Sequence, residues 1–291
     1  MRVIIAPLQS TKDDGSAIHL PATSRKAPIP LEIRIELFER VKRLRRRGLS
    51  YSKIRKVLAE NYGYTPSKSL LSEWLRGLHS PVGSANLFGA EPTPELAYVI
   101  GVKLGDGSIN RKGYNRRIRL QSIDQEFVME FDRCLSKILH TRRHRLWADK
   151  RRREIHIEAR SVLLYNFLRQ SLDDFKGWIE YSPQSVASFL RGFFDSEGST
   201  SKDGSLRGFN SDTNLLRYVQ CLLTTFFKIE TTGPHLVAKV GSVMIRRGHR
   251  YLRRQNVYEI YVRREGLDNF SKNIGFTIRR KSGRLNGVLQ P

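Results

Sequence analysis

Cysteines and long apolar runs are both scarce in this chain of 291 residues. Its two cysteines, Cys134 and Cys221, allow at most one disulfide and cannot build a cysteine metal site, which excludes secreted disulfide scaffolds and zinc fingers. No segment approaches the roughly 18 uncharged apolar residues of a membrane span, and the apolar start Met1–Ala6 is too short for a signal peptide. We therefore expect a cytoplasmic protein that has no contact with membranes.

Acidic residues are also few, because 28 Asp and Glu stand against 52 Lys and Arg, a formal net charge of +24. With 39% hydrophobic residues the chain can bury a core, so this charge belongs to a folded body. The basic residues form many short clusters from Arg43 to Lys281, whereas a membrane-surface protein concentrates them on one amphipathic helix. A thermophilic surface rich in ion pairs would be balanced in sign. The pattern favours a long polyanion, and we predict a nucleic-acid partner.

The amino-terminal third contains three short helical patterns after an extension without periodicity, residues 1–30, to which we assign no function. The first pattern ends at Gly48, Ser50 can cap the second, and the third begins near Ser67. A tight turn before the third helix predicts a helix-turn-helix module over residues 31–78. The predicted apolar faces are Leu31, Ile35, Phe38, Val41 and Leu44; Ile54, Val57 and Leu58; and Leu70, Leu71, Trp74 and Leu75.

The opposite face of the third helix carries the polar and basic side chains Lys68, Ser69, Ser72 and Arg76. We expect them to reach base edges or phosphates of DNA. Any small three-helix bundle has a similar pattern, so a purely structural role for this module stays open. Residues 79–95 are rich in Pro, Gly and Ser and are predicted to be a linker.

The rest of the chain contains a weak internal duplication. Asp106-Gly107-Ser108 corresponds to Glu197-Gly198-Ser199, and each motif is followed by strand patterns that alternate with helical ones. The order predicts an α+β fold of two pseudo-symmetric αββαββα repeats, residues 96–182 and 183–291, with antiparallel sheets. Cys134 and Cys221 are predicted to fill the core in equivalent helices.

Each predicted sheet has an apolar face for helices and a basic face that stays uncovered. In the first hairpin Ile118 and Leu120 point one way, and the side chains between them point the other way. We assign the basic faces to DNA binding. The residues predicted to bind DNA there are Arg117, Arg119, Arg207, Lys239 and Arg263.

Small residues spaced four apart occur in both motifs. Gly101 and Gly105 lie in the first helical segment, and Gly192 and Ser196 lie in the second. Such residues let two helix backbones approach closely. We predict that the two helices pack side by side, with Gly101 and Gly192 at their interface.

An acid followed by glycine ends each of these helices, at Asp106 and Glu197. An acid there faces the negative end of the helix dipole, which is unfavourable by about 0.3–1 kcal/mol when exposed. If the helices pack together the two carboxylates meet, and each raises the pKa of the other unless a cation lies between them. Oxygen ligands favour Mg²⁺ over zinc. We interpret Asp195 as a hydrogen-bonding residue at the helix end.

The segments from Leu96 to Gly107 and from Phe189 to Gly198 resemble the two motifs of a single-chain LAGLIDADG homing endonuclease of archaeal type. The resemblance covers roughly residues 93–286. It implies a monomer whose β-strands form a saddle in the major groove of a long, asymmetric double-stranded DNA site. It also implies Mg²⁺-dependent staggered cleavage that leaves 3′ overhangs, with two or three divalent ions at the repeat interface.

The resemblance also implies roles for the motif residues. Asp106 and Glu197 match the metal-binding acids of the family. Gly105 and Ser196 match the positions whose main-chain carbonyls also ligate metal. These four residues make up the expected metal site.

Outside the motifs the chain matches the family pattern at some positions and departs from it at others. Gln121 matches a polar residue that orders water near the scissile phosphate, with Asn210 as its counterpart. Ser122 and Thr200 stand where relatives carry a lysine. The missing positive charge is expected from Lys281 or Lys202.

Two other functions stay open beside the nuclease. A DNA-binding regulator on the same scaffold would explain the helix-turn-helix but not the retention of both acids. An RNA maturase that assists intron splicing has no distinguishing feature in the sequence. An intein is disfavoured, because the chain starts at Met1 and its end at Pro291 lacks a His-Asn pair and a nucleophile.

Overall fold

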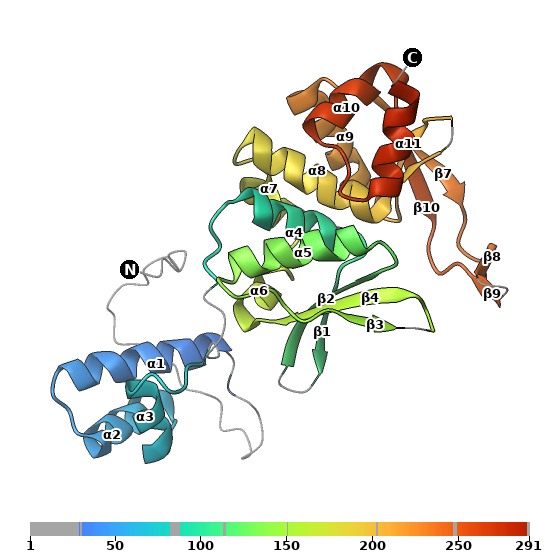
Figure 1. Ribbon diagram of the computed structural model, residues 1–291. Coiled ribbons are helices and arrows are strands. Elements are labelled where there is room, and N and C mark those ends of the chain that lie inside the picture. The colour runs from blue at the N-terminus through green and yellow to red at the C-terminus, as the bar shows by residue number, and fades with distance from the viewer. Residues whose placement is uncertain are drawn as a thin grey trace. The chain divides into compact units, whose positions relative to one another are not determined.

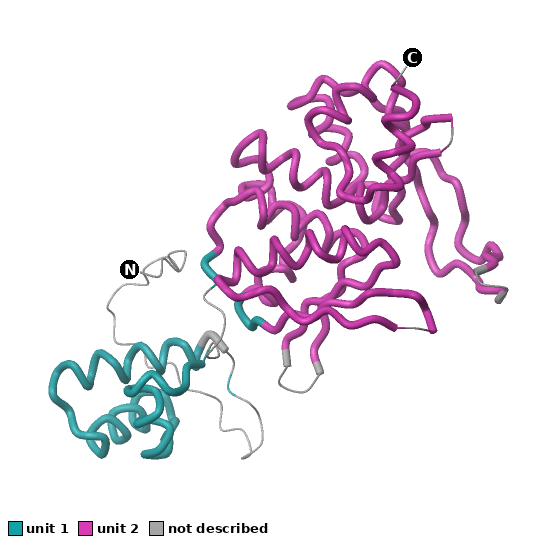
Figure 2. Tube along the Cα trace, in the orientation of Figure 1, with its two compact units in different colours: residues 1–89, 161–163 teal, residues 90–160, 164–291 magenta. Residues whose placement is uncertain are grey.

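The computed structural model describes residue 29 and residues 31–81, 88–112, 115–149, 151–201, 203–246 and 249–289. Of the predicted arm 1–30, only residue 29 is among them, and Lys202 lies outside them. The chain divides into two compact units, residues 1–89 with 161–163 and residues 90–160 with 164–291 (Figure 2). None of the helices in the described ranges is both long and apolar enough to cross a membrane.

The first unit contains the three predicted amino-terminal helices, α1 (Leu31–Arg46), α2 (Tyr51–Tyr62) and α3 (Lys68–Leu75). Side-chain oxygens of Ser50 and Ser67 accept hydrogen bonds from main-chain N–H groups in the first turns of α2 and α3, and Gly63 ends α2 in the left-handed conformation. The helices enclose a core of their own. Its buried members are Leu37, Val41, Leu44, Ile54, Leu58, Leu71 and Trp74.

The predicted face of α1 is wrong at one position. Leu37 is fully buried in this core, whereas Ile35 is only half-buried and is not among the residues packed against it. A helix turns by 100° per residue, so the spacing of Val41 and Leu44 also fits Leu37, four residues before Val41. The helical spacing in the sequence is compatible with either Ile35 or Leu37 on the buried face of α1.

The second unit contains two repeats in chain order (Figure 1). The first repeat runs α4 (Pro94–Leu104), β1 (Ser108–Lys112), β2 (Asn115–Ser122), α5 (Gln125–Ile138), β3 (Trp147–Asp149), β4 (Glu154–Arg160), α6 (Val162–Phe167) and α7 (Leu172–Ile179). The second runs α8 (Pro183–Glu197), β5 (Gly198–Thr200), β6 (Leu206–Asn210), α9 (Thr213–Phe227), β7 (Thr231–Ala238), β8 (Val243–Arg246), β9 (His249–Leu252), β10 (Val257–Val262), η1 (Arg264–Gly266), α10 (Leu267–Asn273) and α11 (Arg279–Leu289).

Both repeats build a four-stranded antiparallel sheet of the same topology. The strand order is β1-β2-β4-β3 in the first sheet and β5-β6-β10-β7 in the second, and β8 pairs only with β9. The α+β fold of two pseudo-symmetric repeats behind a helical amino-terminal region is confirmed. Among the described residues, the additions to the expected αββαββα order are α7, the β8–β9 hairpin, η1 and α11.

Helices α5 and α9 bury their apolar faces against the two sheets, but their cysteines differ. Cys134 is buried in α5, as predicted. Cys221 is exposed on α9, so the prediction that it fills the core is wrong. The buried face of α9 consists of Leu215, Leu216, Val219, Leu222 and Leu223, which leaves position 221 on the solvent side of the helix.

Helices α4 and α8 pack side by side at the interface of the repeats (Figure 1). A Cβ atom added to Gly192 would lie 2.5 Å from the carbonyl oxygen of Tyr98, and one added to Gly101 would overlap the carbonyl oxygen of Phe189. Only glycine allows main chain to lie against main chain at this distance. Thr93 and Ser182 cap the two helices, and Pro94 and Pro183 occupy their first turns.

Candidate functional site

The close packing of α4 and α8 brings two carboxylates to one end of the repeat interface. Asp106 lies in the exposed turn after α4, and Glu197 is the last residue of α8. Gly105 lies where the end of α4 contacts the end of α8, because a Cβ atom added to it would lie 3.0 Å from Cγ of Glu197. Burial, and then the negative charge of Asp106, raise the pKa of Glu197 to about 7.

The residues around this pair fit a hard divalent cation. Burial and the negative charge of Asp106 keep the pKa of Glu197 raised although Lys281 acts in the opposite direction, so a bound cation would further stabilise the ionised pair. Among the described residues no three His, Cys, Asp or Glu side chains lie so that they could hold a metal ion together, so further ligands at this pair would be main-chain carbonyls and water. Mg²⁺ is commonly held in this way, by one or two carboxylates with several waters.

Lys281, from α11, lies buried behind the acids. Its Nζ donates hydrogen bonds to the carbonyl oxygens of Phe194 (3.0 Å) and Asp195 (2.6 Å) in the last turn of α8. Burial lowers the pKa of Lys281 to about 8, although the negative charges of Asp195 and Asp106 act in the opposite direction. The Oγ1 of Thr200 donates to the carbonyl oxygen of Lys281 (3.2 Å). Lys281 therefore places a positive charge at the negative end of the α8 dipole.

Asp195 is almost fully buried beside this lysine. Its carboxylate accepts hydrogen bonds from the hydroxyl of Tyr98 and from the main-chain N–H of Thr277, both at 2.9 Å. Burial nevertheless raises its pKa. The side chain connects α4 to the chain before α11, which holds the acid-bearing end of α8 in place.

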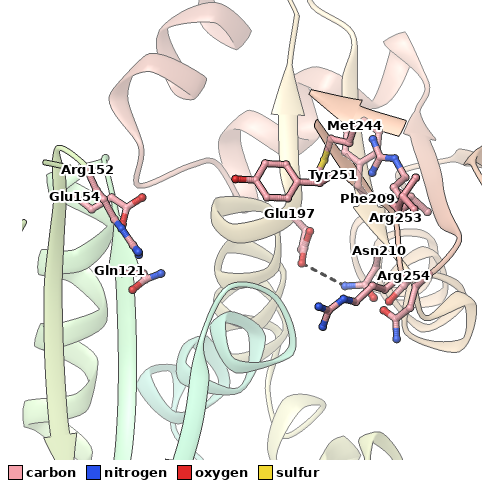
Figure 3. A pocket seen from close by; sticks show the side chains of 14 residues that line it. Gln121, Arg152, Glu154, Glu197, Phe209, Asn210, Met244, Tyr251, Arg253 and Arg254 are labelled. Carbon is pink, nitrogen blue, oxygen red and sulfur yellow. Dashed lines mark hydrogen bonds between the residues drawn. The ribbon is translucent and has the colours of Figure 1, made fainter. Parts of the chain in front are cut away.

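A cleft of about 890 Å³ opens in front of Glu197 (Figure 3). Asn210, at the end of β6, donates from Nδ2 to Oε1 of Glu197 (3.4 Å). Gln121 projects from β2 on the opposite side, so the structure places all three side chains on one cleft. The lining residues are Gln121, Arg152, Glu154, Glu197, Phe209, Asn210, Ser211, Met244, Tyr251, Leu252, Arg253, Arg254, Gln255 and Val257.

The strand register corrects the expected pairing of Gln121 with Asn210. Ser108 pairs with Arg119 in the first sheet, and its counterpart Ser199 pairs with Arg207 in the second. Counting along the strands from these equivalent arginines, Gln121 corresponds to Phe209 and Ser122 to Asn210. The helix caps Asp124 and Asp212 agree with this register. The two sides of the cleft therefore carry different chemistry.

The uncovered face of the first sheet holds its arginines around one acid, Glu158 of β4. The Glu158 carboxylate lies 3.5 Å from Arg117, 3.4 Å from Arg119 and 3.0 Å from Arg160. Arg119 also lies over the ring of Trp147, 5.9 Å from its centroid. The acid is only 11% exposed, and of its three partners Arg117 is the most covered, at 19%.

The second sheet repeats this arrangement with fewer partners. Arg207 lies 3.5 Å from Glu259 and over the ring of Tyr261, 5.6 Å from its centroid. Lys239 is exposed just after β7. Arg263 follows the end of β10 away from the cleft and pairs with Glu230 at 3.4 Å, so the structure does not bring it to the other predicted residues.

The predicted DNA-contacting residues of α3 belong to the first unit. Lys68, Ser69 and Arg76 are exposed there, and Ser72 is half-buried. Their exposure leaves these groups accessible to a nucleic acid.

Comparison with known proteins shows a similar domain and a relative of similar sequence. A LAGLIDADG-like domain model matches residues 184–275, from α8 to the end of α10. An uncharacterised protein of Methanocaldococcus jannaschii, MJ0398, is 33% identical over 261 residues, which make up 88% of this chain and 94% of that protein. The chain belongs to the LAGLIDADG family.

Two solved structures are similar to this LAGLIDADG protein. The homing endonuclease I-DmoI in complex with DNA and calcium has a TM-score of 0.48 and 17% identity, covering 68% of this chain and 100% of that one. Full-length DUF199/WhiA from Thermotoga maritima has a TM-score of 0.45 and 17% identity, covering 69% of this chain and 61% of that one.

Sequence reasoning missed several residues of this LAGLIDADG site. Glu158 and Glu259 alternate with buried residues on strands β4 and β10, so period two alone would have placed them on the basic face. Their partners depend on register between strands, which the sequence does not show. The cleft residues Met244 and Tyr251 carried no signal, because nothing indicated a hairpin between the third and fourth strands of one repeat only.

Proposed function

We propose that this protein is a site-specific, Mg²⁺-dependent DNA endonuclease that cuts both strands of a long asymmetric duplex and leaves 3′ overhangs. The observation that carries the proposal is the pair Asp106 and Glu197, held together by the closely packed ends of α4 and α8 at a cleft flanked by arginines. Two like charges at this point would be unfavourable in a purely structural interface.

Different residues of the chain have different roles around the reacting phosphate. Asp106 and Glu197, with the main-chain carbonyls of Gly105 and Ser196, would hold the divalent ion. A bound Mg²⁺ supplies charge stabilisation at the phosphate and lowers the pKa of an attacking water. Gln121 and Asn210 orient water at the two sides of the cleft.

Lys281 acts from behind the acids. Since its Nζ is buried against the end of α8, it stabilises the ionised carboxylates through its charge and does not reach the DNA. Lys202 remains the second candidate for this positive charge.

DNA binding is assigned to the uncovered faces of the two sheets. Arg117, Arg119 and Arg207 lie on them in fixed positions, and Lys239 lies at the end of β7. Arginine held in this way suits bidentate contacts with guanine or phosphate. The exposed groups on α3 would add contacts from the first unit.

The nuclease is tested with duplexes that the wild-type protein enriches from a randomised pool in the presence of a chelator. Asp106→Asn or Glu197→Gln should abolish Mg²⁺-dependent double-strand cleavage, while affinity for the enriched duplexes stays within about tenfold, because phosphate contacts supply most of the binding. Asp268→Asn, on α10, removes one negative charge elsewhere and should cut normally.

Unchanged cleavage by either acid variant would overturn the assignment of the metal site. Enrichment of duplexes without cleavage by the wild type in Mg²⁺ would favour the DNA-binding regulator. Preferential retention of structured RNA would favour the maturase.

A further inference from the structure

The two repeats differ most in the connection between their third and fourth strands. In the first sheet, residues 150–153 join β3 to β4. In the second sheet, residues 239–256 join β7 to β10 and include the β8–β9 hairpin. We call residues 239–256 the ribbon. The described part of the first repeat has no corresponding hairpin between its third and fourth strands.

The described part of the ribbon, residues 239–246 and 249–256, continues from the second sheet through main-chain hydrogen bonds. The main-chain N–H of Gly241 donates to the carbonyl oxygen of Arg253 (2.8 Å), and the N–H of Arg253 donates to that of Ser242 (3.0 Å). At its base the N–H of Val240 donates to Oδ1 of Asn256 (2.9 Å). These bonds link the β7–β10 ladder to the β8–β9 ladder, and the β8–β9 hairpin extends beyond the ends of β7 and β10 (Figure 1).

One side of the ribbon forms a wall of the cleft. Met244 and Tyr251 are paired across β8 and β9 and line the cleft together with Glu197. Arg253 and Arg254 follow them along the same wall (Figure 3). The opposite wall comes from the first repeat, at Gln121, Arg152 and Glu154. The ribbon therefore lies beside whatever occupies the cleft.

The composition of the ribbon suits contact with DNA, which has charged phosphates and apolar groups on its bases and sugars. It contains six basic residues and no acidic residue. Arg250 and Arg254 are exposed, and Tyr251 is 48% exposed. Val243, Ile245, Arg250 and Leu252 share the face opposite to Met244 and Tyr251, and the three apolar side chains on it are 51%, 72% and 67% exposed. Apolar side chains next to arginines are common where proteins contact thymine methyl groups and sugars.

We propose that the ribbon is a DNA-binding element that lengthens the duplex segment contacted by the second repeat, with Arg250, Arg253 and Arg254 on phosphates. The proposal rests on the DNA partner of the proposed function but not on cleavage. It makes the bound site longer on one side, and so fixes the orientation of the protein on its target.

The test uses the full chain and a duplex enriched by the wild type in chelator. The ribbon variant carries Arg250→Gln, Arg253→Gln and Arg254→Gln. A matched control carries Arg217→Gln, Lys228→Gln and Arg264→Gln, which remove the same charge on α9, just after it and on η1. Hydroxyl-radical footprints and the salt dependence of Kd are measured, with thermal melting to show that both variants fold.

The ribbon variant should lose protection at one end of the footprint only. Its log–log salt slope should fall by about 2–3 relative to the wild type, since each lost phosphate contact reduces the slope by about 0.9. The control should keep the full footprint. A footprint and slope shared by ribbon variant and control would overturn the ribbon proposal alone. A wild-type protein that protects no duplex would overturn both proposals, and one that protects but never cuts would overturn only the nuclease.

Discussion

Glu197 shows how the requirements of the site oppose those of folding. Its carboxyl is largely removed from water, ends a helix at the negative pole of the dipole, and faces a second acid. Each of these features disfavours the ionised form. The ionised form is the one that a divalent cation requires.

A stability measurement should reveal this opposition. Because the folded-state pKa of Glu197 is about 7 and its ordinary value is 4.5, the folded protein binds this proton more tightly than the unfolded chain does. Stability therefore falls as the pH rises from about 4.5 to about 7, and the full penalty remains above pH 7. Without metal at pH 8, Glu197→Gln should raise the free energy of unfolding by about 1–2 kcal/mol, a Tm increase of several degrees.

The gain from Glu197→Gln should shrink to a few tenths of a kcal/mol near pH 4.5, where the carboxyl is protonated in the folded state and about half protonated in the unfolded state. Glu91→Gln, an exposed loop position, serves as the control and should leave Tm unchanged at both pH values. An equal stabilisation by Glu197→Gln at pH 4.5 and 8 would show that the carboxyl is not the source of the penalty.

Single residues of the site were predictable where chemistry and a repeated motif coincided. Asp106 and Glu197 stood out because an acid before glycine occurs twice in equivalent positions. Glu158 and the supporting contacts of Lys281 and Asp195 were not predictable in the same way, because their roles depend on partners far away in the chain. Tertiary contacts of this kind leave no local pattern.

At the scale of the element, the α4–α8 interface depends on the absence of side chains. Gly192→Ala would place a methyl group 2.5 Å from a main-chain carbonyl oxygen, and a helix backbone cannot move aside as a flexible side chain does. We expect the free energy of unfolding to fall by about 1–3 kcal/mol or more. Chemical denaturation checks this value.

The matched control is Gly177→Ala in the middle of α7. An added Cβ there meets no atom within 4 Å, so the substitution should stabilise the protein by about 0.5–1 kcal/mol through helix propensity. Destabilisation by both substitutions, to the same extent, would refute the idea that close packing makes position 192 special.

Helices and strands were predictable where the periodicity was strong, but the residue-by-residue equivalence of the two repeats was not. The repeats, the antiparallel sheets and the helices that cover them followed from alternating and helical patterns. The pairing of Gln121 with Asn210 was off by one residue, because the connection between the first two strands differs in length between the repeats. A shift of one residue moves a side chain to the other face of a strand, which only the hydrogen-bond register resolves.

At the scale of the whole molecule, the two compact units have separate cores, so the first unit should be removable. The cut belongs after Gly89, since the carbonyl oxygen of Ala90 accepts the indole N–H of Trp178 (2.6 Å) within the second unit. The truncated protein should fold, retain metal-dependent cleavage, bind DNA more weakly and protect a shorter segment.

A variant with Lys68→Gln and Arg76→Gln separates DNA contact from structural support. Both side chains are exposed, so the variant should keep the wild-type Tm and still lose the same part of the footprint. A truncated protein with an unchanged footprint and a lower Tm would show that the first unit is a structural cap, and the helix-turn-helix assignment would be withdrawn.

The arginines around Glu158 also affect how DNA binding is divided between enthalpy and entropy. An arginine side chain loses roughly 2 kcal/mol of conformational freedom when it is fixed in one rotamer. Arg117 and Arg119, held against a largely buried carboxylate, lose much of that freedom when the protein folds and before any DNA arrives. In the proposed complex the first sheet would meet the duplex with its contact groups already ordered, so the entropy lost on binding would fall mainly on the DNA and on the solvent between the two surfaces.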